Sequence, residues 1–179
     1  MTKRPLFFAA ALAALVTAMP GSAELAQGVK APQFTATGAQ AGKPITFDLA
    51  KALRKGPVVL YFFPAAFTPG CNIEAAAFAQ AIPDFRAAGA TVIGVTAGNT
   101  DQLADFSGKH CAGQFAVAAA TPKIRDEYQV ALPNNPNGWT SRTTYVIDKS
   151  GKIVMAYSAM QPNEHITRSL AAVRALKRG

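Results

Sequence analysis

The residues with the most evident chemistry lie in segment 64–74, which reads PAAFTPGCNIE. Cys71 follows an apolar run typical of a buried strand, and it opens a stretch that predicts a helix. In the first turn of a helix, unpaired backbone N–H groups and the positive end of the helix dipole favour a thiolate over a thiol. Thr68 lies three residues earlier, where its hydroxyl can reach a ligand above the sulfur. The segment therefore indicates a reactive cysteine, although a cysteine can also be an inert filler of a core.

The residues around Cys71 support this interpretation. Pro64 ends the strand and can shield the sulfur from solvent, and Pro69 with Gly70 lets the chain turn sharply into the helix. Glu74 is one helical turn further on, where its carboxylate can hold a cation near the sulfur. A thiolate with a hydroxyl and a charged group beside it is suited to redox chemistry.

The pattern Pro64-x3-Thr68-x2-Cys71 resembles the active-site motif of the peroxiredoxins, the alkyl hydroperoxide reductase/thiol-specific antioxidant family. The rest of the chain is similar to that family as well, from Gly28-x-x-Ala31-Pro32-x-Phe34 near the start to SRTTYVID at 141–148 near the end. The resemblance covers roughly residues 28–176. It implies a thioredoxin-like fold and a thiol-dependent peroxidase that reduces hydrogen peroxide and organic hydroperoxides.

The resemblance also implies a role for each residue of the site. Cys71 is the peroxidatic cysteine, whose thiolate attacks the O–O bond and becomes a sulfenic acid. Thr68 hydrogen-bonds the peroxide, and Arg142, at the opening of a late strand, stabilises the thiolate and the leaving oxygen. Glu74 orients an arginine. From the residues alone, Arg142 could equally be an exposed arginine, and Glu74 a charge at a helix N-terminus. The expected partners are a peroxide and a thiol reductant such as a thioredoxin-like protein, with no metal or other cofactor.

Cys111, the second of the two cysteines, decides the subtype. The chain resembles most the branch of bacterioferritin comigratory protein (PrxQ-like), which often has a resolving cysteine five residues after the peroxidatic one. That position is Ala76 here, so this pattern is absent. Some members of the branch place a resolving cysteine in the helix that ends near residue 111, which makes Cys111 a candidate. The alternative is a free thiol at a helix end, with an external thiol as the reductant.

Two other classes of protein remain open at this point. A periplasmic thioredoxin-like thiol–disulfide oxidoreductase would share the fold, but its C-x-x-C pair is missing, because Glu74 stands three residues after Cys71. A non-catalytic exported domain on the same fold would show no peroxide-dependent oxidation of Cys71. His165 lies far from the motif along the chain and receives no role.

The elements that must position these residues alternate between strand and helix. Residues 24–44 are small, polar and Gly-rich, and we expect an extended lead-in with at most short strands. The apolar patterns predict strands over 57–63, 91–96, 115–118, 143–147 and 153–157, and helices over 48–53, 71–88, 99–109, 123–129 and 163–177. This alternation predicts one α/β domain, with a central mixed sheet and helices on both faces.

Residues 1–23 have the pattern of a signal peptide. Lys3 and Arg4 precede an uncharged apolar run over 6–18, and Gly21 and Ala23 are the small residues expected before a cleavage site. The run is shorter than the ~20 apolar residues that cross a membrane. We therefore expect an exported protein, in the bacterial periplasm, with a domain over 24–179.

The composition bounds the remaining possibilities. A chain of 179 residues suits one domain, and 50% hydrophobic against 16% charged residues exclude a disordered protein. A classical zinc module needs four Cys or His ligands close together, which the two cysteines, 40 residues apart, do not provide, and two histidines are too few for a His-based metal site. The net charge of +8 is spread along the chain without a dense basic run, so no nucleic-acid partner is expected. We expect a monomer or a weak dimer.

Overall fold

The computed structural model describes residues 24–178, and the predicted signal peptide lies outside the described residues. The strands are β1 (Thr35–Gln40), β2 (Lys43–Asp48), β3 (Val58–Phe62), β4 (Thr91–Thr96), β5 (Ala116–Ala119), β6 (Thr143–Ile147) and β7 (Ile153–Ser158). The helices are α1 (Leu49–Lys55), α2 (Pro69–Ala87), α3 (Leu103–Lys109) after a 3₁₀ turn η1 (Thr100–Gln102), α4 (Pro122–Glu127) and α5 (Asn163–Arg178). Across residues 24–178, no helix is both long and apolar enough to span a membrane.

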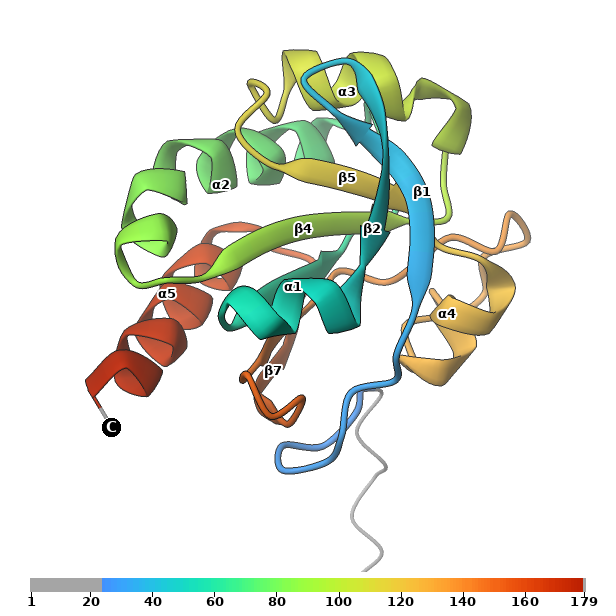
Figure 1. Ribbon diagram of the computed structural model, residues 1–179. Coiled ribbons are helices and arrows are strands. Elements are labelled where there is room, and N and C mark those ends of the chain that lie inside the picture. Colours follow the sequence, from blue (N-terminus) through green and yellow to red (C-terminus); the bar gives the residue numbers. More distant parts are fainter. Residues whose placement is uncertain (1–23, 179) are drawn as a thin grey trace, which may run out of the picture.

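One mixed sheet organises the described part of the chain, with the strands in the order β2-β1-β5-β4-β3-β6-β7. β3 is parallel to β4 and antiparallel to β6, and β4 is parallel to β5. The helices lie on both faces of this sheet, as Figure 1 shows. The α/β class and the mixed sheet with helices on both faces are therefore confirmed.

β3 runs through the middle of the core, and all five of its residues are buried. Its side chains alternate between two apolar clusters, as the pleat of a strand requires. Val59 and Tyr61 belong to the cluster that also holds apolar side chains of α2, α3 and α5, while Val58, Leu60 and Phe62 belong to the cluster with α1 and α4. This double burial explains why the strand has a continuous apolar sequence. The end of β3 is thus a rigid base for the loop that follows.

The largest correction to the predicted elements concerns residues 24–44. They were expected to hold at most short strands, but β1 and β2 form a hairpin of two six-residue strands. The two-residue turn Ala41-Gly42 has positive φ at both positions, 51° and 76°, which suits the right-handed twist of a hairpin. Alanine is not a usual residue at such a position, so the sequence carries no strong turn signal there.

The start of α2 also differs from the prediction. The helix begins at Pro69 rather than at Cys71, because Thr68 has extended backbone angles and Pro69 is preorganised for the first helical position. Cys71 is therefore the third residue of α2 and still lies within its first turn.

Candidate active site

Cys71 lies where the chain passes from the central strand into α2, and it is a free cysteine with 1% of its surface exposed. Its backbone N–H is one of those at the helix start that lack an acceptor within the helix, Pro69 having no N–H. These groups and the helix dipole present positive potential at the place where the sulfur is held. The local structure is thus the one predicted from the segment.

The loop between β3 and α2 is fixed by hydrogen bonds to the end of β4. The Thr96 hydroxyl donates to the Pro64 carbonyl at 3.0 Å, and Gly98 approaches so closely that a Cβ there would lie 2.4 Å from the same oxygen. The Thr68 hydroxyl donates to the Ala65 carbonyl at 3.0 Å. Because its hydrogen is used in this bond, the lone pairs of the Thr68 oxygen stay free to accept a hydrogen bond from a ligand.

Arg142 comes from just before β6 and reaches the sulfur of Cys71. Its Nη2 donates to Sγ at 3.5 Å, while Nη1 forms an ion pair with Oε2 of Glu74. Its Nε donates to the Met160 carbonyl at 3.0 Å. Since the Arg142 side chain is nearly buried and held on three sides, the guanidinium is a fixed positive group beside the sulfur. The structure thus brings Arg142, from just before β6, against Cys71 and Glu74 of α2, whose N-cap is Thr68.

The charges of this site are shielded from water. Burial raises the pKa of the Glu74 carboxyl, against the opposing effect of Arg142. Burial works to lower the pKa of Arg142, yet the charges of Glu74 and Cys71 outweigh it and leave that pKa above its ordinary value. A guanidinium that stays charged in a site of low polarity stabilises negative charge on sulfur and oxygen more strongly than it would in water.

His165 is the residue of this region to which the sequence analysis gave no role. Its Nδ1 lies 4.0 Å from Oε1 of Glu74, and the ring is fully buried. The residue belongs to the buried face of α5 together with Ser169 and Val173, at spacings of four residues. That spacing in the sequence was the available signal, since it places a histidine on an apolar helix face.

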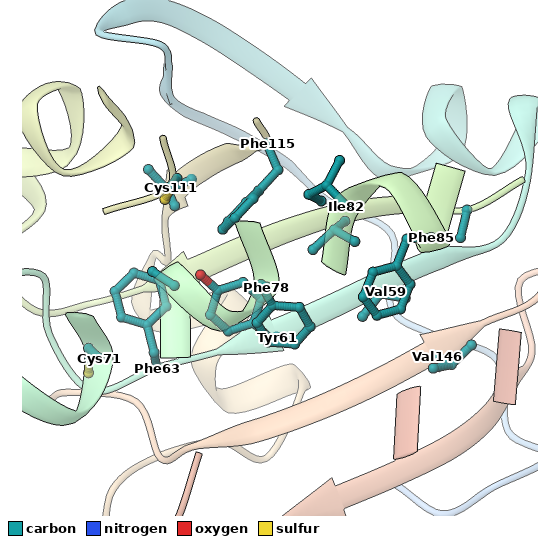
Figure 2. Close-up of a cluster of buried hydrophobic side chains, with 14 of the residues drawn as sticks. Val59, Tyr61, Phe63, Cys71, Phe78, Ile82, Phe85, Cys111, Phe115 and Val146 are labelled. Atoms are coloured by element: carbon teal, nitrogen blue, oxygen red, sulfur yellow. The ribbon is translucent and has the colours of Figure 1, made fainter. Parts of the chain in front are cut away.

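Cys111 lies just beyond the end of α3, as predicted, and is also free and fully buried. Figure 2 shows it in the same apolar cluster as Cys71, at a separate position and on a different element. Burial raises the pKa of the Cys111 thiol. Aromatic rings connect the two regions: Phe63 stacks on Phe106 with ring centroids 5.4 Å apart, and Phe67 packs edge to face against Phe106 with centroids 5.5 Å apart.

Three comparisons with known proteins show the family and the fold. The AhpC/TSA family matches residues 27–156. A chloroplastic peroxiredoxin Q of Sedum lineare is 33% identical over 157 residues, which cover 87% of this chain and 81% of that protein. The chloroplastic peroxiredoxin Q of Arabidopsis thaliana is 34% identical over 160 residues, which cover 86% of this chain and 69% of that protein.

Solved structures give the same result for the fold. The crystal structure of peroxidoxin BcpB from Mycobacterium tuberculosis has a TM-score of 0.72 and 28% identity, covering 84% of this chain and 97% of that one. The structure of the bacterioferritin comigratory protein of Xanthomonas campestris has a TM-score of 0.65 and 25% identity, covering 79% of this chain and 91% of that one. The thioredoxin-like fold predicted by resemblance is therefore confirmed, and the chain belongs to the AhpC/TSA family of peroxiredoxins, which are thiol peroxidases that reduce peroxides.

Proposed function

We propose that Cys71 is the peroxidatic cysteine of this peroxidase, and the observation that carries the proposal is the 3.5 Å contact between Arg142 Nη2 and Cys71 Sγ. The thiolate attacks one oxygen of the peroxide, so that an S–O bond forms as the O–O bond breaks. Cys71 becomes a sulfenic acid. The other oxygen leaves as hydroxide or alkoxide and takes up a proton, giving water or an alcohol. Arg142 stabilises the negative charge first on sulfur and then on the departing oxygen.

Three further residues prepare this step in our proposal. The Thr68 oxygen accepts a hydrogen bond from the peroxide, because its own hydrogen is already donated to Ala65. Pro64 closes the end of the strand and keeps water from the sulfur; it is buried. Glu74 orients the guanidinium of Arg142 through the ion pair on Nη1.

Cys111 is the candidate resolving cysteine. It would attack the sulfenic acid to give an intramolecular disulfide with Cys71, after which a thioredoxin-like protein would reduce the disulfide. Both cysteines are buried and free, and a disulfide needs Cα atoms within about 7 Å, so we propose that the first turn of α2 and the end of α3 loosen to let the sulfurs meet. An external thiol acting directly on Cys71 is the alternative.

The substrate class follows from the reaction: hydrogen peroxide and organic hydroperoxides. The Xanthomonas campestris relative is described by its alkyl peroxide reduction activity, which supports the organic part of this class. We also propose that the protein works as a monomer or a weak dimer. The pattern of residues 1–23 supports export to a bacterial periplasm. Cell fractionation together with N-terminal sequencing tests the export, and a full-length chain in the cytoplasm would contradict it.

A peroxide consumption assay tests the proposed role of Cys71. The purified protein is given hydrogen peroxide or cumene hydroperoxide with several thiol reductants, beside Cys71→Ser as the matched variant. We expect turnover in the wild type and none above background in Cys71→Ser, with unchanged circular dichroism. Turnover that survives in Cys71→Ser would refute the assignment.

A further inference from the structure

His165 is fully buried between α5 and the sheet, and its hydrogen bonds define which ring nitrogen carries the hydrogen. Nε2 lies 2.9 Å from the carbonyl oxygen of Ala159. A carbonyl only accepts, so Nε2 carries the hydrogen, and Nδ1 of the neutral ring is bare. The Thr144 hydroxyl lies 2.8 Å from Nδ1 and therefore donates to it. Both ring nitrogens are thus used, one as donor and one as acceptor.

Each of these two bonds reaches a segment that holds Arg142. Ala159 precedes Met160, whose carbonyl accepts from the Arg142 Nε, and the Ala159 N–H itself donates to the Arg142 carbonyl at 3.2 Å. Thr144 lies two residues after Arg142 along the chain. By fixing Ala159 and Thr144, His165 restrains the backbone on both sides of the arginine.

A third contact reaches the acidic partner of the arginine. His165 Nδ1 faces Oε1 of Glu74 at 4.0 Å, and this buried oxygen has no hydrogen-bond partner. The only strong partner of the Glu74 carboxylate among the contacts of the described residues is therefore Arg142, through the other oxygen. A hydrogen donor in place of the bare Nδ1 would compete with Arg142 for the carboxylate.

We propose that His165 is a positioning residue of the peroxidatic site, which places the Arg142 guanidinium against Cys71 through Ala159, Thr144 and Glu74. The proposal rests on the proposed role of Arg142 beside the sulfur. It gives the last helix of the fold an indirect part in the chemistry, since no hydrogen bond or ion pair described for residues 24–178 joins α5 to Cys71.

The ring must remain neutral for this role, and its surroundings favour the neutral form. Burial lowers the pKa of His165 to about 4. The charged groups that face the ring are Glu74 from α2, Arg142 from just before β6, and Glu164 and Arg168 on its own helix. The ring of Tyr157 on β7 packs edge to face against it, with centroids 4.8 Å apart. The bare Nδ1 is therefore retained at neutral pH.

Three substitutions of His165 separate its contacts. His165→Gln keeps an amide donor for Ala159, His165→Asn keeps an acceptor for Thr144, and His165→Leu keeps neither. Val173→Ala is the matched control, because Val173 is buried on the same face of α5 but two helical turns away. Circular dichroism and thermal melting show which variants fold. If His165→Leu does not fold, the Gln and Asn variants still provide the test.

The measured quantity is the rate of Cys71 alkylation by iodoacetamide as a function of pH, in a Cys111→Ser background. We expect His165→Leu to slow alkylation at pH 7 by about tenfold and to move the profile to higher pH, with smaller changes for the Gln and Asn variants. Val173→Ala should lower the melting temperature and leave the profile in place. An unchanged profile in all three His165 variants, or an equal shift in Val173→Ala, would overturn the proposal.

A double-mutant cycle with Arg142→Ala completes the test. Because all three contacts act on the arginine, His165→Leu should change the alkylation profile little once Arg142 is absent. Independent, additive effects would mean that His165 acts elsewhere, and the proposal would fail. Alkylation requires no peroxide, so an absence of peroxide turnover in the wild type would refute the proposed function while leaving this result interpretable.

Discussion

Cys71 and Cys111 lie in one apolar cluster and are buried to the same degree, with 1% and 0% of their surface exposed. Their surroundings differ in charge. Cys71 lies in the first turn of the 19-residue helix α2 and has Arg142 at 3.5 Å. Cys111 follows the end of the short helix α3, where its backbone N–H donates a hydrogen bond to the Phe106 carbonyl. Burial alone acts on its thiol and raises its pKa.

Burial therefore does not decide whether a cysteine reacts. Removing a sulfur from water disfavours the thiolate in both places. At Cys71 a buried guanidinium and free helix N–H groups replace the lost hydration with positive potential, whereas the contacts described for residues 24–178 give Cys111 no such group.

The two single-cysteine variants compare the sites directly. Cys111→Ser, given one equivalent of hydrogen peroxide, should form a sulfenic acid at Cys71 as fast as the wild type. In Cys71→Ser, oxidation of Cys111 should be slower by at least ~1,000-fold, since the thiolate is scarce and no cation stabilises the leaving oxygen. Stopped-flow fluorescence and dimedone labelling measure both rates. Comparable rates would mean that the charged surroundings are irrelevant to reactivity.

Removing the cation should make Cys71 resemble Cys111. We expect Arg142→Ala to slow the peroxide step by about 10²–10³-fold and to shift the alkylation profile to higher pH. The variant also leaves Glu74 buried without its cation, which costs about 3–5 kcal/mol of unfolding free energy.

Glu74→Gln in the Arg142→Ala background separates these two effects. The double variant should regain much of the stability, as measured by urea denaturation, and none of the peroxide rate. Recovery of the rate would show that the loss came from a disturbed fold rather than from the missing guanidinium.

The Thr68 hydroxyl should matter less than the arginine. Thr68→Val keeps the shape and removes both the acceptor for the peroxide and the bond to Ala65, so we expect the rate constant for peroxide to fall by about 10²-fold. Thr68→Ser is the control and should retain most of the activity. A Thr68→Val enzyme with the wild-type rate constant would limit Thr68 to a structural role in the loop.

The sequence predicted Cys71 and its loop well because the chemistry there is contiguous. Pro64 marks the end of the strand and Pro69 the start of the helix, and the buried strand β3 shows in its unbroken apolar run, whereas the role of Cys71 as the nucleophile stays a prediction. The β1–β2 hairpin was missed because Ala41-Gly42 adopts left-handed angles without a typical turn sequence.

Arg142, which contacts the sulfur of Cys71, lies 71 positions further along the chain, and its contacts could not be predicted from local patterns. Glu74 and Arg142 are separated by 68 positions, and only the resemblance to a family connected them. His165 hydrogen-bonds Thr144, 21 positions earlier, and closes a network that exists only once α5 has packed on the sheet. Long-range polar contacts of this kind depend on the tertiary structure and leave no periodic signal.

The Cys111 thiol should matter mainly after the first oxidation. We expect one equivalent of peroxide to give an intramolecular Cys71–Cys111 disulfide, seen by mass spectrometry as a loss of about two daltons with both cysteines in one linked peptide. Under excess peroxide, Cys111→Ser should inactivate several-fold sooner than the wild type, because its sulfenic acid persists and is oxidised further to sulfinic acid. A stable sulfenic acid in the wild type, or a disulfide-linked dimer, would exclude the intramolecular pair.

The smallest effect concerns how the charged site responds to acid. His165 has a folded-state pKa of about 4 against its ordinary 6.5, so between these values the unfolded chain binds more protons than the native protein. The contribution of His165 to the free energy of unfolding is therefore fully present above pH 6.5. It declines as the pH falls toward 4, by about 1 kcal/mol between pH 6 and pH 5.

The His165→Gln variant lacks this titration and is the comparison protein. Urea midpoints of both proteins across this range should converge as the pH falls, while the raised pKa of Glu74 contributes a slope of opposite sign to both curves. Parallel curves would show that the ring takes up its proton in the native protein as readily as in the unfolded chain, and that the surroundings of Arg142 do not hold His165 neutral.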